Sequence, residues 1–176
     1  VMHETGHALY EQGLPREYMS QPVGKALGMA AHESQSLLME GFVLQNDAFL
    51  RWLSEKMTRF YHTDECSFDR LKKMSRRVEP SLIRIDADGV TYPLHVIVRY
   101  ELEKDLIGGA LDVDDLPEAW NVKMREYLGV VPKTDAEGCL QDIHWAAGSF
   151  GYFPDYTVGA VAAAQFFAAA RAAVPD

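Results

Sequence analysis

Apolar residues recur along this chain at the three- and four-residue spacing of α-helices, with glycine and proline between the runs. The longest run covers residues 29–61 and predicts one long helix or two closely joined helices. The same spacing, with capping residues, glycine or proline at the ends, predicts further helices over residues 1–13, 67–79, 93–107, 114–129 and 157–174.

Two segments depart from this pattern. Residues 81–89, SLIRIDADG, alternate apolar and polar side chains in their first half and predict a short strand. Residues 141–159 are rich in aromatic residues and glycine, which predicts short helix mixed with loop. The expected fold class is therefore mainly α with at most a small β-sheet, in a single domain over residues 1–176.

The composition of the chain limits the classes of binding partner that we expect. The chain has 17 basic and 26 acidic residues and a net charge of −9, which argues against nucleic acid and anionic membranes as partners. The basic run Arg70 to Arg77 is expected to form a solvated helix face. No run approaches the ~20 apolar residues of a membrane span. Cys66 and Cys139 form no paired spacing, which favours a reducing, cytoplasmic location.

The motif HETGH at residues 3–7 carries a specific chemistry. On a helix, His3 and His7 share one face about 6 Å apart along the axis, so that both ring nitrogens can reach one ion at about 2.0–2.1 Å. Glu4 is rotated off that line and can act on water at the metal as a general base. Two histidines on a solvated helix face would show the same spacing by chance, so other residues must decide.

A zinc peptidase site needs a third protein ligand. Glu11 would lie about 12 Å along the axis from His3, too far to share an ion with it. The longer metzincin motif needs glycine at position 10 and histidine at position 13, where this chain has Tyr10 and Gly13. The third ligand must therefore come from another helix.

Glu33, in HESQS at residues 32–36, is the candidate for that ligand because the preceding loop allows the chain to fold back. The alternative is an exposed helix carboxylate. Glu40 shares the helix face of Glu33 and is expected to support the site, whereas His32 is expected to make a supporting or packing contact.

The chain resembles the carboxypeptidase Taq family of zinc carboxypeptidases over essentially its whole length. The blocks that carry the resemblance occur in order as HETGH at 3–7, HESQS at 32–36, IRIDAD at 83–88, TYPLHVIVRYELE at 91–103, GCLQDIHW at 138–145 and GYFPDYTVG at 151–159. The resemblance implies a helical fold with a deep substrate groove, a homodimer, and removal of single C-terminal residues from peptides with proline disfavoured.

The resemblance also implies roles for residues. It assigns zinc, with cobalt as a possible substitute, to His3, His7 and Glu33, and it makes Glu4 the general acid/base. The IR block and the G-x-x-Q-D-x-H-W block are implied to help form the substrate site.

The chemistry of a carboxypeptidase suggests three further candidates. His144 and Tyr156 are candidate donors to the developing oxyanion, although aromatic blocks are more often core. Arg84 is the candidate for the substrate's terminal carboxylate, because a guanidinium group binds carboxylates in a bidentate manner, and its alternative is a surface charge on a strand.

Two departures from the family pattern stand out. Asp88-Gly89 replaces the usual Asp-Glu pair, and the arginine block that precedes HExxH in the longer family chains is absent. We therefore expect a fragment that lacks the N-terminal part. A catalytically impaired zinc-binding fragment and a different HExxH endopeptidase are the alternatives to an active carboxypeptidase.

Overall fold

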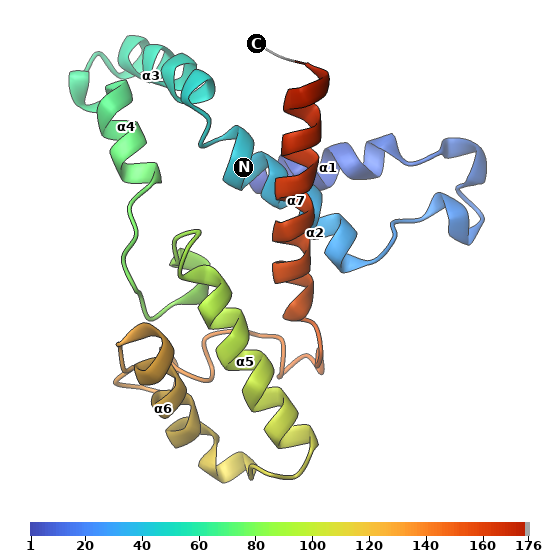
Figure 1. Cartoon of the computed structure of the whole chain (residues 1–176), viewed down its shortest axis with the longest axis vertical. Coiled ribbons are helices and arrows are strands. Elements are labelled where there is room, and N and C mark those ends of the chain that lie inside the picture. Colours follow the sequence, from blue (N-terminus) through green and yellow to red (C-terminus); the bar gives the residue numbers. More distant parts are fainter. Residues whose placement is uncertain (175–176) are drawn as a thin grey trace. The chain divides into compact units, whose positions relative to one another are not determined.

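The computed structural model describes residues 1–174, which form seven α-helices and no β-strand (Figure 1). The mainly α fold class is confirmed. The chain divides into two compact units, one formed by residues 1–77 with the segment from Asp155 onward, and the other by residues 78–154. The expectation of a single domain stays a prediction. No helix within residues 1–174 has the length and apolarity needed to cross a membrane.

The first unit contains most of the predicted helices. Its helices are α1 (Met2–Gly13), α2 (Met29–Leu37), α3 (Asp47–Tyr61), α4 (Phe68–Ser75) and α7 (Pro154–Ala173). The long run over residues 29–61 is two helices: α2 continues as a π-helical turn over Leu38–Val43, and α3 starts anew after Asn46. Asn46 begins α3 because its Oδ1 accepts a hydrogen bond from the Ala48 amide at 2.8 Å.

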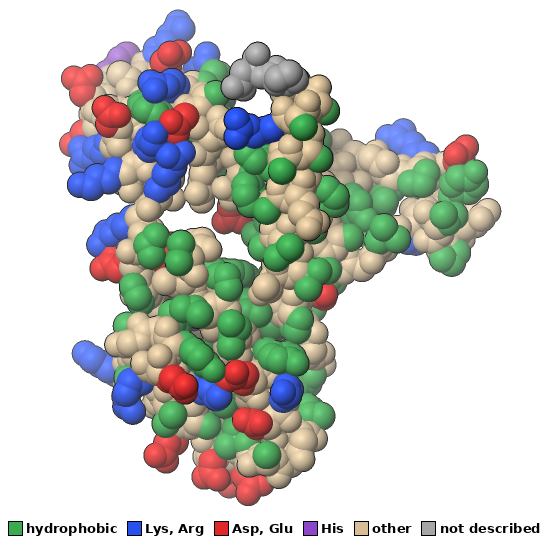
Figure 2. Space-filling view, viewed as in Figure 1, with side chains coloured by type: hydrophobic (Ala, Val, Ile, Leu, Met, Phe, Trp, Pro, Cys, Tyr) green, Lys and Arg blue, Asp and Glu red, His purple; other side chains and the backbone are tan. Residues whose placement is uncertain are grey.

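Lys and Arg side chains gather over α3 and α4 (Figure 2). Lys72 of α4 and Arg76, which follows the last residue of α4, both pair with Asp47, at 2.7 and 2.6 Å, and these groups remain substantially exposed to solvent. Exposed pairs of this kind contribute little stability, about 0–1 kcal/mol. The basic run is therefore the solvated helix face that its sequence predicts.

The second unit has its own hydrophobic core between α5 (Tyr92–Ile107) and α6 (Leu116–Leu128). The buried side chains of α6 recur once per turn and form one stripe, namely Leu116, Trp120, Met124 and Leu128. This stripe packs with Val98 and Leu102 of α5 and with Cys139. Gly129 ends α6 with φ +70°, a left-handed conformation that favours glycine.

The predicted strand over residues 81–89 is wrong. The segment is extended loop around a 3₁₀ turn, Arg84–Asp86. Gln141 takes the place of a partner strand, since its Oε1 accepts from the Arg84 amide at 2.8 Å and its Nε2 donates to the Leu82 carbonyl at 3.0 Å. The alternation also does not bury the apolar side chains as a strand would, because Arg84 is buried and Ile85 is 73% exposed.

Two helix boundaries near the glycine-rich block also differ from expectation. Residues 141–153 form turns without the short helix that was predicted. Helix α7 begins at Pro154 rather than at Thr157, because proline suits the first turn of a helix. Tyr156 consequently lies on a helix and not in a loop.

Asp88 holds the turn that leads into α5. Its Oδ1 accepts from the amides of Val90 and Thr91, and its Oδ2 accepts from the Thr91 hydroxyl and the Glu79 amide, all at 2.8–3.0 Å. Burial acts to raise the pKa of this carboxyl group, but the four hydrogen bonds outweigh burial and lower the pKa to about 2. A Cβ added at Gly89 would meet no atom within 4 Å, so a side chain fits there.

We expect Asp88→Asn to reduce the free energy of unfolding by about 1–3 kcal/mol near neutral pH, because an amide cannot accept all four hydrogen bonds. The folded pKa lies below the unfolded value of 3.8. The stability that the carboxylate contributes is therefore complete above about pH 4 and is lost as the pH falls toward about 2. Denaturant unfolding at several pH values measures both effects.

Asp86→Asn is the matched control for this prediction, because Asp86 is exposed on the same segment. It should leave both the stability and its pH dependence unchanged. If Asp88→Asn lost stability between pH 4 and 2 as steeply as the unmodified chain, the assigned role of the Asp88 carboxylate would be wrong.

Candidate metal centre

Helices α1 and α2 form an antiparallel pair whose backbones touch at Gly6. A Cβ added at Gly6 would lie 2.2 Å from the Gln35 carbonyl oxygen and 2.5 Å from the Ser36 Cα. Only glycine therefore permits this approach, although a mid-helix glycine costs about 1 kcal/mol relative to alanine. The close contact positions side chains from the two helices against each other.

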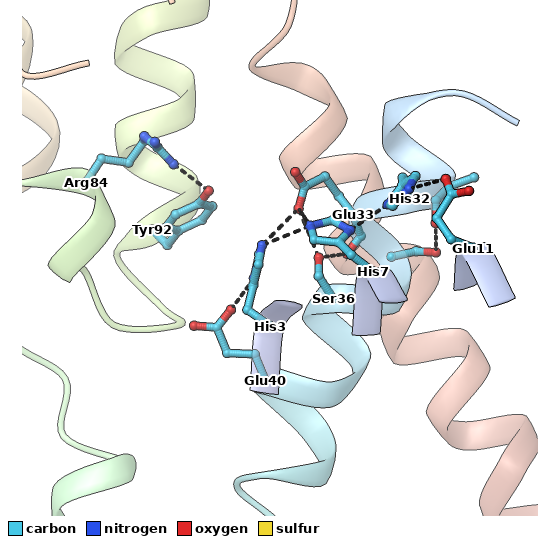
Figure 3. A network of polar contacts seen from close by, with 11 residues as sticks. His3, His7, Glu11, His32, Glu33, Ser36, Glu40, Arg84 and Tyr92 are labelled. Carbon is cyan, nitrogen blue, oxygen red and sulfur yellow. Dashed lines mark hydrogen bonds and ion pairs between the residues drawn. The ribbon is translucent and has the colours of Figure 1, made fainter. Parts of the chain in front are cut away.

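The three predicted ligands converge between these helices (Figure 3). His3 Nε2 and His7 Nε2 lie 3.1 Å apart. Glu33 Oε2 lies 3.7 Å from the first nitrogen and 3.8 Å from the second. Two histidines one turn apart on α1 and one carboxylate from α2 therefore present three ligand atoms to one point.

These distances fit a small divalent cation. The circle through the three atoms has a radius of about 2.1 Å, and zinc–nitrogen and zinc–oxygen bonds are about 2.0–2.2 Å. Two imidazoles and one carboxylate are also a ligand set typical of catalytic zinc, which leaves a further position open. The residues present thus fit a zinc ion in both chemistry and spacing.

The burial of Glu33 strengthens this interpretation. Its side chain is only 6% exposed and accepts a hydrogen bond from Ser36 Oγ at 3.0 Å. Helix α7 covers it at Gly159, where an added Cβ would lie 3.0 Å from the Glu33 Cβ. A buried carboxylate without a nearby cation is costly, so a bound metal would balance its charge. The alternative of an exposed helix carboxylate is excluded.

His3 and His7 each use the second ring nitrogen in a further contact. His3 Nδ1 lies 2.8 Å from Glu40 Oε2, as expected for a supporting carboxylate. His7 Nδ1 lies 2.5 Å from His32 Nδ1. Burial lowers the pKa of His7; Glu33 and Glu4 oppose this change, and the two neighbouring histidines add to it. A neutral imidazole with a free lone pair is the form that binds metal.

Glu4 and Tyr156 belong to the same unit as the three ligands. Glu4 follows His3 on α1 and is exposed, which leaves its carboxylate accessible to water and substrate. Tyr156 lies in the first turn of α7, three residues before Gly159 and so on the same side of that helix as the contact with Glu33.

Arg84 and His144 lie in the second unit, where both are near Asp142. Arg84 donates from Nε and Nη2 to the two carboxylate oxygens of Asp142, at 3.1 and 2.8 Å, and from Nη1 to the Tyr92 hydroxyl at 2.8 Å. Arg84 is thus a buried, paired arginine and not a surface charge. Burial lowers the pKa of His144, Asp142 raises it, and Arg84 and Arg99 lower it, with a net decrease.

Sequence reasoning missed three residues that shape these sites. Glu11 was rejected as a ligand, but its Oε1 lies 2.9 Å from His32 Nε2. Gly6 offered a signal, since glycine inside a predicted helix suggests close packing. Asp142 lies in the block that is implied to help form the substrate site, but its pairing with Arg84 has no local signal, because Arg84 is far away in the sequence.

Comparison with known proteins identifies the family. A family model described as carboxypeptidase Taq (M32) metallopeptidase matches residues 1–176. The chain belongs to the M32 metallopeptidase family. Thermostable carboxypeptidase 1 of Thermus thermophilus is 49% identical over 173 residues, and carboxypeptidase 1 of Bacillus subtilis is 43% identical over 167 residues. These matches cover 98% and 94% of this chain but 34% and 33% of the relatives, so the chain spans about a third of their length.

Solved structures agree with this M32 assignment. Metallocarboxypeptidase 1 of Trypanosoma cruzi has a TM-score of 0.93 at 43% identity, over 99% of this chain and 35% of that one. The M32 carboxypeptidase of Deinococcus radiodurans has a TM-score of 0.92 at 41% identity, over 99% of this chain and 36% of that one. The family is one of metallopeptidases, which implies a divalent metal, and the cluster of His3, His7 and Glu33 could hold such an ion.

We expect Gly6→Ala to separate α1 from α2 and to destabilise the chain by about 1–3 kcal/mol or more, as overpacking does. Zinc retention should fall with it, because His3 and His7 move away from Glu33. Thermal unfolding and zinc content after desalting measure the two effects. Gly13→Ala, at the open end of the same helix, has no atom within 4 Å of the new Cβ and should change neither. Normal zinc retention in Gly6→Ala would show that the close approach is unnecessary.

Proposed function

We propose that this chain carries the zinc centre of a carboxypeptidase that removes single residues from free peptide C-termini, with broad preference and with proline disfavoured. The observation that supports this most directly is the meeting of His3, His7 and Glu33 at distances suited to one zinc ion. The named relatives are carboxypeptidases, which supports the exopeptidase class for the longer proteins.

The proposal gives the residues of the first unit distinct roles. His3, His7 and Glu33 hold zinc, for which cobalt is a possible substitute. Zinc, when bound, supplies a Lewis acid that polarises the scissile carbonyl and makes water more acidic. Glu4 takes a proton from the attacking water and delivers it to the leaving amine, as a general acid/base does. Its exposure next to His3 supports this role.

Substrate handling is proposed for three other residues. Arg84 would bind the terminal carboxylate, because a guanidinium group matches a carboxylate in charge and in shape. His144 and Tyr156 would donate hydrogen bonds to the developing oxyanion. The net decrease in the pKa of His144 supports a neutral ring there at physiological pH, which can donate from one nitrogen.

We also propose the setting in which this site works. The partners are peptides with a free C-terminus rather than nucleic acid or membranes, and the longer protein would be a homodimer. Both cysteines are free thiols, which supports the proposed cytoplasmic location.

The first experiment that tests the proposal is zinc content. After zinc loading and desalting, we expect about one tightly held ion per 176-residue chain, measured by atomic emission. His7→Ala and Glu33→Gln should each abolish retention, because two ligands do not form a closed site. His62→Ala, which changes an exposed histidine outside the cluster, is the control. Equal retention by His7→Ala and the unmodified chain would refute the metal site.

The second experiment separates the catalytic roles. Glu4→Gln should retain zinc but reduce peptide cleavage by about 10²-fold or more, as loss of a general acid/base does. Amidation of the peptide C-terminus should abolish cleavage by a carboxypeptidase and leave an endopeptidase unaffected. Cleavage of the amidated peptide would favour the endopeptidase. Retained zinc with no cleavage by the unmodified chain would identify a zinc-binding segment that is catalytically impaired.

A further inference from the structure

A series of polar contacts extends from His7 at the metal centre through a second histidine to a carboxylate at the surface. His7 Nδ1 lies 2.5 Å from His32 Nδ1, and His32 Nε2 lies 2.9 Å from Glu11 Oε1 (Figure 3). His32 is 17% exposed and Glu11 is 56% exposed, so the contacts lead outward. His3 has the simpler arrangement, with Glu40 directly on its Nδ1.

The Glu11 carboxylate, at the outer end of these contacts, fixes the direction of both hydrogen bonds. An ionised carboxylate only accepts, so His32 must carry its proton on Nε2 to donate to Glu11. The Nδ1 of neutral His32 is then an acceptor, and His7 must donate to it from Nδ1–H. The Nε2 of His7 is left with a lone pair, and this is the atom that faces His3 and Glu33.

Without the carboxylate the opposite direction becomes available. His32 could donate from Nδ1–H to His7 Nδ1, and His7 would then carry its proton on Nε2. That proton would point at His3 Nε2, which lies 3.1 Å away and can accept it. A proton at this position occupies the nitrogen that a metal needs. The present arrangement excludes this state, because the His32 Nε2 lone pair would face the Glu11 carboxylate at 2.9 Å.

We propose that Glu11 and His32 are positioning residues that keep the proton of His7 on Nδ1 and thereby present its Nε2 lone pair to the metal. This inference rests on the metal site of the proposed function and adds two residues to it. The carboxylate–histidine–metal arrangement recurs in metalloproteins, and here one histidine carries its effect one ring further.

Other contacts fix the orientation of the His32 ring. The Tyr10 ring meets it edge-on, with 5.2 Å between the ring centroids, and the Tyr10 hydroxyl accepts from the Leu27 amide at 3.1 Å. The hydrogen bond from His32 to Glu11 is exposed at its carboxylate end, where a polar contact contributes little to the stability of the fold. Its effect should therefore be seen at the metal site rather than in the stability of the chain.

The first test reads the histidine tautomers directly in the metal-free 176-residue chain. At about pH 8, above the ordinary histidine pKa of about 6.5, nitrogen-15 correlation spectra should show His7 protonated on Nδ1 and His32 on Nε2. In Glu11→Leu both rings should reverse, with His7 protonated on Nε2. Glu55→Leu, on an exposed face of α3, should keep the pattern of the unmodified chain. An Nε2 proton on His7 in the unmodified chain, or unchanged tautomers in Glu11→Leu, would overturn the proposal.

The second test measures the zinc dissociation constant by competition with a chelator. Glu11→Leu should bind zinc about 10–100-fold more weakly, the usual effect of losing such a partner of a ligand. Glu11→Gln keeps an acceptor oxygen and should lose less, while Glu55→Leu should bind like the unmodified chain. Circular dichroism of the metal-free variants should be unchanged, which separates this effect from unfolding.

The outcomes distinguish this inference from the metal site itself. Zinc binding that is equally tight in Glu11→Leu would refute the positioning role and leave the metal site intact. A failure of the unmodified chain to bind zinc would refute the metal site, and the tautomers of the metal-free chain would still decide the positioning role.

Discussion

The contact of two helix backbones at Gly6 determines the arrangement of everything around the metal centre. Because a Cβ there would meet the Gln35 carbonyl oxygen at 2.2 Å, any other residue would force α1 away from α2. Bonds to a metal vary by only a few tenths of an ångström, so even a small displacement of α1 would leave Glu33 out of reach of the two histidines. Because the two helices run antiparallel, the first residues of α1 face the residues that follow α2. The last residues of α1 face the first residues of α2.

The helices could be predicted because their causes are local. The apolar residues that form a helix lie within it, and the glycines and prolines that end it lie beside it. The boundaries of α1, α5 and α6 therefore follow closely from the sequence. Residues 81–89 were mistaken for a strand because the Gln141 side chain that satisfies their backbone comes from far along the chain. The π-helical turn after α2, which carries Glu40, likewise has no signal in apolar spacing.

The candidate site could likewise be predicted only where its geometry depends on residues close together in the sequence. His3 and His7 are related by one helix turn, so their geometry follows from the sequence alone. Glu33 required the helices to fold back on each other, which the loop made plausible and the structure brings about. Spacing excludes Glu11 as a ligand but does not predict its contact with His32, because the position of His32 depends on the packing of the two helices. The burial of Arg84 depends in the same way on Asp142.

The packing of Gly159 over Glu33 has a consequence for the order in which the site matures. Ribosomes make the chain from its N-terminus at about 5–20 residues per second, so α1 and α2 emerge several seconds before α7. During that interval the three ligands exist without the helix that shields Glu33 from water. The buried form of the carboxylate therefore depends on a helix that is made after both of the helices that carry the ligands.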